Sequence, residues 1–261
     1  MFDKNKINLS IMEAITSFSN LEGIHSIIFN NFQKKIFTNP KDIELFSEEY
    51  SLLFEDFLDD FYVKRNIKKG KITKVVINVF NYISKKGNRL DFNDIDKLCS
   101  ELQKRNLSSN SSDKNKNIRP LSLASKIAFL SNPELVIPID KYTKKGIKII
   151  LKTRTSKKDY ITYYNNAMNI YKNNFKTEVI QNFEQKFFLE DFSDMTDAFE
   201  LFLSKFKKIS NELEISDFKE LIAIRALDKY LMIADNSYGD ERFEKGIRKR
   251  LKRLEIIKER F

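Results

Sequence analysis

An aspartate in front of a strongly basic segment is the feature of this sequence best suited to chemistry. Residues 119–146 read RPLSLASKIAFLSNPELVIPIDKYTKKG, and Asp140 stands where a lysine-rich helix is expected to begin. A helix start offers free backbone amides and a partial positive charge, so a carboxylate there should stay ionised. Lys126 lies near the end of the preceding predicted helix, and a chain reversal at Pro133 could bring the two side chains together. An aspartate before a helix is usually a simple cap.

The charge of the chain is strongly polarised. The sequence has 261 residues, with 47 Lys and Arg against 37 Asp and Glu, which gives a net charge of +10. Residues 42–60 hold eight acidic and no basic residues, whereas residues 141–158 hold eight basic and no acidic residues. A basic run of this kind is either a solvated helix face or a surface that follows nucleic-acid phosphates. The basic segment is therefore a candidate DNA-binding surface.

Helical periodicity dominates the chain and predicts an all-α fold. We expect a single helical domain over residues 1–261, or two helical lobes with a cleft between them, and a mobile polar loop at about 106–117. Apolar stripes and capping residues predict helices over residues 43–61, 72–83, 91–102, 121–130, 141–151, 158–172, 176–190, 194–208, 216–233 and 240–260. Residues 135–139 are expected to be extended.

Composition argues against several kinds of function. One cysteine, Cys99, and one histidine, His25, exclude an internal disulfide, a Cys-rich zinc site and a pair of histidine ligands. We therefore expect no metal and no small-molecule cofactor. The N-terminus lacks the pattern of a signal peptide, and no apolar run reaches 18 residues. These features predict a soluble cytoplasmic protein that does not enter a membrane.

Two segments resemble helix-hairpin-helix DNA glycosylases. The run SKIAFLSNPELVIPID, from Ser125 to Asp140, is similar to the helix and the turn that deliver an aspartate to the mouth of the base pocket in that superfamily. The run IRALDKYL, residues 224–231, is similar to the closing helix of distantly related bacterial proteins; within it, Arg225 and Asp228 are spaced to pair on one helix. The resemblance implies that Asp140 is the catalytic carboxylate and that Lys126 is an auxiliary nucleophile or a phosphate contact.

The same resemblance implies contacts to double-stranded DNA with one base flipped out. Phe129 and Tyr142 would line the base pocket, although either could instead be a core residue. The glycine-rich hairpin of the family is absent at residues 118–122, and Lys126 is closer to the aspartate (140 − 126 = 14 residues) than in members with lyase activity. The residues expected to contact DNA phosphates are Arg119, Ser122, Ser125, Lys141, Lys144, Lys145 and Lys148.

The resulting expectation is a DNA glycosylase that removes a damaged or modified base, either in repair or in defence against phage. An ionised carboxylate beneath the sugar would stabilise the positive charge that develops as the base leaves. The missing hairpin glycines favour an alternative, a helical nucleic-acid-binding protein without catalysis. A third possibility is a protein–protein adaptor whose basic face meets an acidic partner.

Overall fold

The computed structural model describes the greater part of the chain, and its described residues form helices and no β-strand. The predicted loop at 106–117, Arg119 and most of the predicted helix over 43–61 lie outside this part. The described residues are 2–33, 41, 45, 54–61, 63, 67, 70–86, 89–104, 120–152, 159–185, 196–234 and 239–258. The all-α prediction is confirmed.

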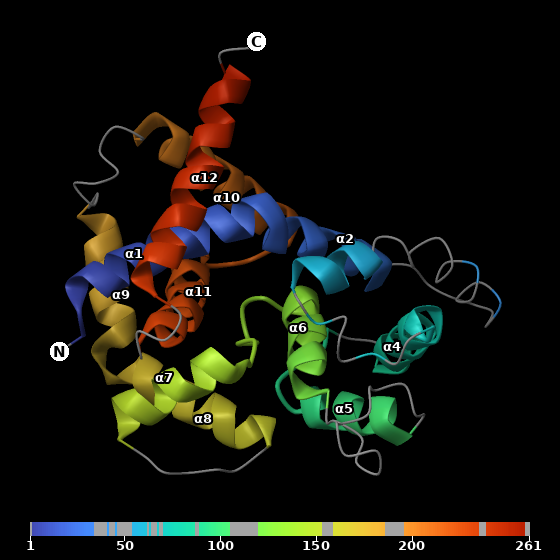
Figure 1. Cartoon of the computed structure of the whole chain (residues 1–261). Coiled ribbons are helices and arrows are strands. Elements are labelled where there is room, and N and C mark those ends of the chain that lie inside the picture. The colour runs from blue at the N-terminus through green and yellow to red at the C-terminus, as the bar shows by residue number, and fades with distance from the viewer. Residues whose placement is uncertain are drawn as a thin grey trace. The chain divides into compact units, whose positions relative to one another are not determined.

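The chain divides into two compact units. Unit 1 comprises Met1–Ile27, Asp140–Lys158 and Thr162–Phe261, and unit 2 comprises Ile28–Ile139 and Asp159–Ile161. The helices with full bounds, drawn in Figure 1, are α1 (Lys4–Ser17), the π-helix η1 (Phe18–Glu22), α2 (Gly23–Gln33), α4 (Ile72–Lys86), α5 (Asp94–Lys104), α6 (Leu121–Ser131), α7 (Lys141–Leu151), α8 (Tyr160–Ile170), the π-helix η3 (Tyr171–Phe175), α9 (Lys176–Glu184), α10 (Thr196–Glu212), α11 (Phe218–Ile233) and α12 (Asp240–Lys258). Residues 54–60 are helical as well.

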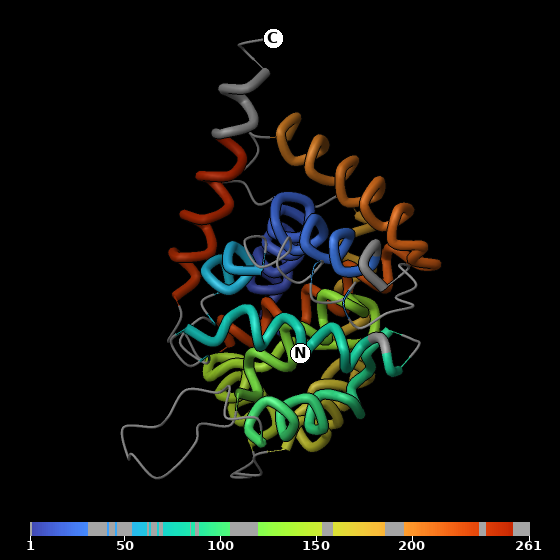
Figure 2. The backbone as a smooth tube through the Cα atoms, turned by 90° about the vertical axis from the view of Figure 1, so that its right-hand side faces the viewer, coloured from blue at the N-terminus to red at the C-terminus, as the bar shows by residue number. Residues whose placement is uncertain are grey.

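Unit 1 is built around α1 and α11. The helix α11 packs between α1 and α7 (Figure 1), and α10 and α12 both pack against α1 (Figure 2). Helix α1 is buried over most of its surface, including Ser10 and Thr16. Their hydroxyls donate to the carbonyl oxygens of Lys6 and Met12 four residues earlier, at 2.6 and 2.8 Å. These bonds satisfy polar groups that would otherwise be costly to bury.

Unit 2 holds α4, α5, α6 and the extended residues 136–139. Among the described residues the extended segment pairs with no strand, and side chains satisfy part of its backbone. The Tyr160 hydroxyl donates to the Ile137 carbonyl oxygen at 2.7 Å and accepts from the Ile137 amide at 3.2 Å. The Ser125 hydroxyl oxygen accepts from the Ile139 amide at 3.0 Å. These bonds fix the chain immediately before Asp140.

Most of the predicted helices are confirmed, with differences at their ends. The helix predicted over 141–151 matches α7, and the one predicted over 121–130 matches α6 to within one residue. The helix predicted to reach residue 190 ends at Glu184, where α9 turns at Gln185. The predicted gap between residues 172 and 176 is the kink in η3, where Asn174 has a φ of 71°.

Candidate active site at the start of α7

Asp140 is the N-cap of α7 in unit 1. Its backbone is extended, and its Oδ1 accepts hydrogen bonds from the amides of Tyr142 at 2.7 Å and Thr143 at 2.9 Å. The Thr143 hydroxyl in turn accepts from the Asp140 amide at 3.0 Å, which completes a capping box. The side chain of Asp140 is half-buried. One carboxylate oxygen is therefore held in a fixed position by the helix start.

The exposed side of α7 is a row of lysines. Lys141, Lys144, Lys145 and Lys148 are all exposed and follow the spacing i, i+3, i+4, i+7, which places them on one side of the helix. The helix contains no acidic residue. The Lys141 ammonium lies 4.6 Å from the centre of the Tyr142 ring, which is half-buried. We call these four lysines the α7 lysine face.

The buried side of α7 fixes the position of this face. Thr143, Gly146 and Ile147 are buried, and α7 packs on α11. A Cβ atom built on Gly146 would lie 2.0 Å from the Leu231 carbonyl oxygen. The close approach of the two helices therefore requires glycine at this position. The placement of Asp140 and the lysine face consequently depends on α11.

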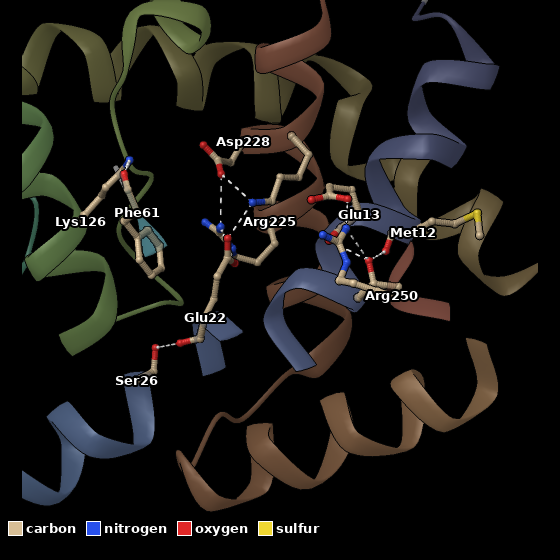
Figure 3. Close-up of polar contacts among 11 residues, drawn as sticks. Met12, Glu13, Glu22, Ser26, Phe61, Lys126, Arg225, Asp228 and Arg250 are labelled. Carbon is tan, nitrogen blue, oxygen red and sulfur yellow. Dashed lines mark hydrogen bonds and ion pairs between the residues drawn. The ribbon is translucent and has the colours of Figure 1, made fainter. Parts of the chain in front are cut away.

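Helix α11 carries a cluster of buried ionic groups (Figure 3). Arg225 Nη2 donates to Glu22 Oε2 at 2.8 Å and to Asp228 Oδ2 at 3.2 Å, which confirms the predicted pairing of Arg225 with Asp228. Lys229 Nζ donates to Glu22 Oε1 at 2.7 Å. All four side chains are buried, and Glu22 is the last residue of the π-helix η1. We call Glu22, Arg225, Asp228 and Lys229 the buried ion cluster.

The two carboxylates of the buried ion cluster are shifted in opposite directions. Burial alone would raise the pKa of Glu22, but the charges of Arg225 and Lys229 lower that pKa to about 2. For Asp228, burial outweighs the same two cations and raises the pKa, and the negative charges of Glu22 and Asp140 act in the same direction. Asp140 is thus electrostatically linked to the cluster within unit 1.

The low pKa of Glu22 predicts a pH-dependent stability difference between wild type and Glu22→Gln. The folded-state pKa of about 2 lies below the ordinary value of 4.5, so the carboxylate stabilises the fold above pH 4.5 and loses this effect as the pH falls towards 2. We expect Glu22→Gln to cost about 3 kcal/mol near neutral pH, and the difference to shrink across this window.

Urea unfolding at a series of pH values measures this difference. The matched control is Glu184→Gln, since Glu184 is an exposed carboxylate that also pairs with a lysine, Lys219 at 2.6 Å. The control should change the free energy of unfolding by less than about 1 kcal/mol at neutral pH. A wild-type advantage over Glu22→Gln that stays constant from neutral pH down to pH 2 would contradict the assignment.

The other predicted site residues lie on α6 in unit 2. Ser125 and Phe129 are fully buried there, and the Ser125 hydroxyl also donates to the Ser122 carbonyl oxygen at 3.1 Å. Both are interior residues, because nearly every side of α6 is packed, so we do not assign them to a DNA surface or a base pocket. Ser122 is half-buried.

Lys126 is anchored within unit 2 as well. Its Nζ donates to the Phe61 carbonyl oxygen at 2.8 Å and lies 5.7 Å from the centre of the Phe61 ring (Figure 3). An ammonium group bound to a carbonyl and an aromatic ring is a stabilising contact for the residue-61 turn. Lys126 and Asp140 belong to different units. We therefore build the candidate site from Asp140 and α7 alone.

Sequence patterns did not reveal Glu22, Lys229 or the pair formed by Glu13 and Arg250. Glu22 is 203 residues from Arg225, and Glu13 is 237 residues from Arg250. The signal that could have indicated partners for α11 elsewhere in the fold is the presence of three charged residues in the otherwise apolar run AIRALDKYLMI. Charges inside an apolar helix require partners from elsewhere in the fold.

Neither a metal site nor a membrane span is found in the described part of the chain. None of its groups of His, Cys, Asp and Glu could hold a metal ion. Across the described ranges, every helix is too short or too polar to cross a bilayer. Comparison of the chain with protein-family models, with curated proteins and with solved structures finds no match.

Proposed function

We propose that the chain is a DNA glycosylase of the helix-hairpin-helix type, which removes a damaged or modified base from duplex DNA with Asp140 as the catalytic carboxylate. The observation that supports this proposal is the arrangement at the start of α7. There the amides at the start of α7 bind one oxygen of a half-buried carboxylate, and the same helix carries four exposed lysines.

The geometry of Asp140 suits electrostatic catalysis. Its Oδ1 is bound by two amides, and its Oδ2 accepts no hydrogen bond from any described residue. A carboxylate whose position is fixed by two amides needs little reorganisation when positive charge develops on the deoxyribose. The carboxylate would stabilise this oxocarbenium-like state or position the attacking water.

The α7 lysine face would hold the DNA while the base leaves the stack. Flipping a base costs a few kcal/mol, and contacts to the backbone can offset that cost. Each phosphate that a lysine neutralises releases counterions, so binding should weaken steeply as salt increases. The partner in this proposal is double-stranded DNA, and neither a metal nor a small-molecule cofactor is required.

A second candidate function is DNA binding without catalysis. Two observations favour it: the capping box gives Asp140 a complete structural role, and the glycines of the family hairpin are missing at residues 118–122. In that case the α7 lysine face would bind DNA and Asp140 would only cap α7. Only the glycosylase would produce an abasic site.

Asp140→Asn separates the two candidates. Asparagine is also a good N-cap, so α7 should remain folded, but it lacks the negative charge that stabilises the transition state. For a glycosylase we expect Asp140→Asn to lower the rate of abasic-site formation by at least about a hundredfold, with DNA affinity nearly unchanged. The substrate is a duplex that contains the damaged or modified base. The rate of abasic-site formation is measured as strand breakage after alkali treatment.

The matched control is Asp217→Asn. Asp217 is the N-cap of α11 and accepts from the amides of Lys219 at 2.9 Å and Glu220 at 3.1 Å, but it is exposed and not on α7. This variant should form abasic sites at the wild-type rate. Equal activity of Asp140→Asn and Asp217→Asn would reduce Asp140 to its capping role. DNA binding with no abasic product from the wild type would select the non-catalytic candidate.

A further inference from the structure

A second basic surface lies on α12, away from the proposed site. The inner side of this helix is apolar, and Phe243, Ile247 and Leu251 are buried against the core of unit 1. The helix packs on α1 and α10. Its rotation about its own axis is therefore fixed, which determines which charged side chains face outward.

One arginine of α12 is turned inward and helps to fix this rotation. Arg250 pairs with Glu13 of α1, and its Nη2 also donates to the Thr16 hydroxyl at 3.1 Å (Figure 3). The side chains of Glu13 and Arg250 are 12% and 20% exposed. This pair is an internal contact and takes no part in the outer surface.

The outer side of α12 carries a row of basic residues. Arg242, Lys245, Lys249 and Lys252 are exposed and follow one another at steps of three, four and three residues. At 1.5 Å per residue the row is about 15 Å long. Glu241, at the first turn, is an exposed acidic residue beside its start. We call the four basic residues the α12 basic face.

The α12 basic face and the α7 lysine face are separate surfaces of unit 1. Helix α12 packs on α1, α1 packs on α11, and α11 packs on α7, so the two faces belong to helices at opposite ends of this series of contacts (Figure 1). A ligand that contacts both helices must therefore be longer than a small anion, and a polyanion such as DNA has this length.

The burial of the apolar side of α12 favours a nucleic acid over a lipid surface. A basic amphipathic helix binds membranes by inserting its apolar side among the lipid chains. In this structure that side is occupied by the core of unit 1, so electrostatic attraction alone remains. A row of exposed cations without an accessible apolar side fits a phosphate backbone.

We propose that the α12 basic face is a second phosphate-binding surface, which contacts the backbone of the same DNA outside the segment held by α7. This inference rests on the proposed function for the identity of the partner. It adds that the DNA footprint of the protein is longer than the α7 site alone requires. It also assigns part of the salt dependence of binding to α12.

The test compares three double variants of the full chain on a duplex several helical turns long. Lys245→Gln/Lys249→Gln weakens the α12 basic face, Lys144→Gln/Lys148→Gln weakens the α7 lysine face, and Lys4→Gln/Lys172→Gln is a control with equal charge loss at exposed positions of unit 1. Dissociation constants are measured over a salt series. Thermal unfolding verifies that each variant is folded.

The proposal predicts a smaller salt dependence for the α12 variant. Two lost phosphate contacts reduce the slope of log K against log salt by about 1.8, so between about 50 and 200 mM salt the α12 variant should lose about tenfold less affinity than the control. If the α12 variant has the same slope as the control and the α7 variant has a smaller slope, this inference is wrong and the proposed function still holds.

The remaining outcomes are also informative. A reduced slope for the α12 variant alone would support the α12 basic face and contradict the α7 lysine face. Equal slopes for all three variants would overturn both.

Vesicles that contain an anionic phospholipid test the other source of phosphate. If the wild type binds them, the α12 variant does not, and the DNA slopes are equal, the partner of α12 is a lipid surface and the proposal is wrong.

Discussion

Replacement of Arg225 by methionine is expected to lower the free energy of unfolding by about 3–5 kcal/mol. The Arg225 side chain is 1% exposed, and its guanidinium bridges Glu22 and Asp228, which are buried as well. Its removal leaves two buried carboxylates to share the single ammonium of Lys229. A buried charge that loses its partner costs far more than the apolar contacts of methionine can restore.

Denaturant unfolding measures this loss of stability, and two further variants serve as comparisons. Arg242→Met, at an exposed position of α12, should change stability by no more than about 0.5 kcal/mol. The double variant Arg225→Met/Glu22→Gln removes one charge of each sign and should be less destabilised than the sum of the single variants. A loss below about 1 kcal/mol for Arg225→Met, or simple additivity in the double variant, would show that the cluster does not act as a unit.

Gly146→Ala is expected to destabilise unit 1 by about 1–3 kcal/mol, although alanine normally favours a helix over glycine. The new methyl group would lie 2.0 Å from the Leu231 carbonyl oxygen, and a backbone atom of a packed helix cannot move aside cheaply. Helix α7 would have to shift on α11. The same variant should therefore weaken DNA binding, since the shift displaces the α7 lysine face.

Gly246→Ala, in the same unit, is expected to change the free energy of unfolding in the opposite direction. A Cβ atom at Gly246 of α12 would meet no heavy atom closer than Arg250 Nη1 at 3.6 Å, which is ordinary contact. Alanine should therefore stabilise α12 by about 0.5–1 kcal/mol. Denaturant unfolding of the two variants should give changes of opposite sign. A stabilised Gly146→Ala would contradict the close packing of α7 on α11.

The sequence predicted α7 and its cap well because their determinants are local. Asp140 and Thr143 are three residues apart and form the capping box by themselves. The lysines follow helical spacing, and the residues between them are the ones that pack. An amphipathic helix with a strong cap is therefore recognisable without knowledge of its neighbours.

Helix α1 was not predicted, because a helix packed on most of its sides does not show a single apolar stripe. It packs against α9, α10, α11 and α12, so apolar residues occur on most of its sides and no single stripe stands out. Buried polar residues such as Ser10 and Thr16 weaken the apolar signal further. Helices at the centre of an all-α unit are for this reason harder to recognise than those at its surface.

The candidate site could be predicted only in part for a related reason. Asp140 and the α7 lysine face follow from local sequence, but the buried ion cluster depends on the meeting of η1 with α11, which are about 200 residues apart. The interior position of Ser125 and Phe129 likewise depends on what packs around α6. Local patterns indicate a helix, and the surrounding fold decides which of its sides are exposed.

The most direct test of the central claim is the release of a free base by the wild-type protein. A panel of duplexes, each with one damaged or modified base, is incubated with wild type and with Asp140→Asn, and released base is identified by mass spectrometry. We expect the wild type to release a base from at least one duplex and to leave an abasic site, while Asp140→Asn binds that duplex and releases far less. Release at equal rates by both proteins, or no release from any duplex, would contradict this expectation.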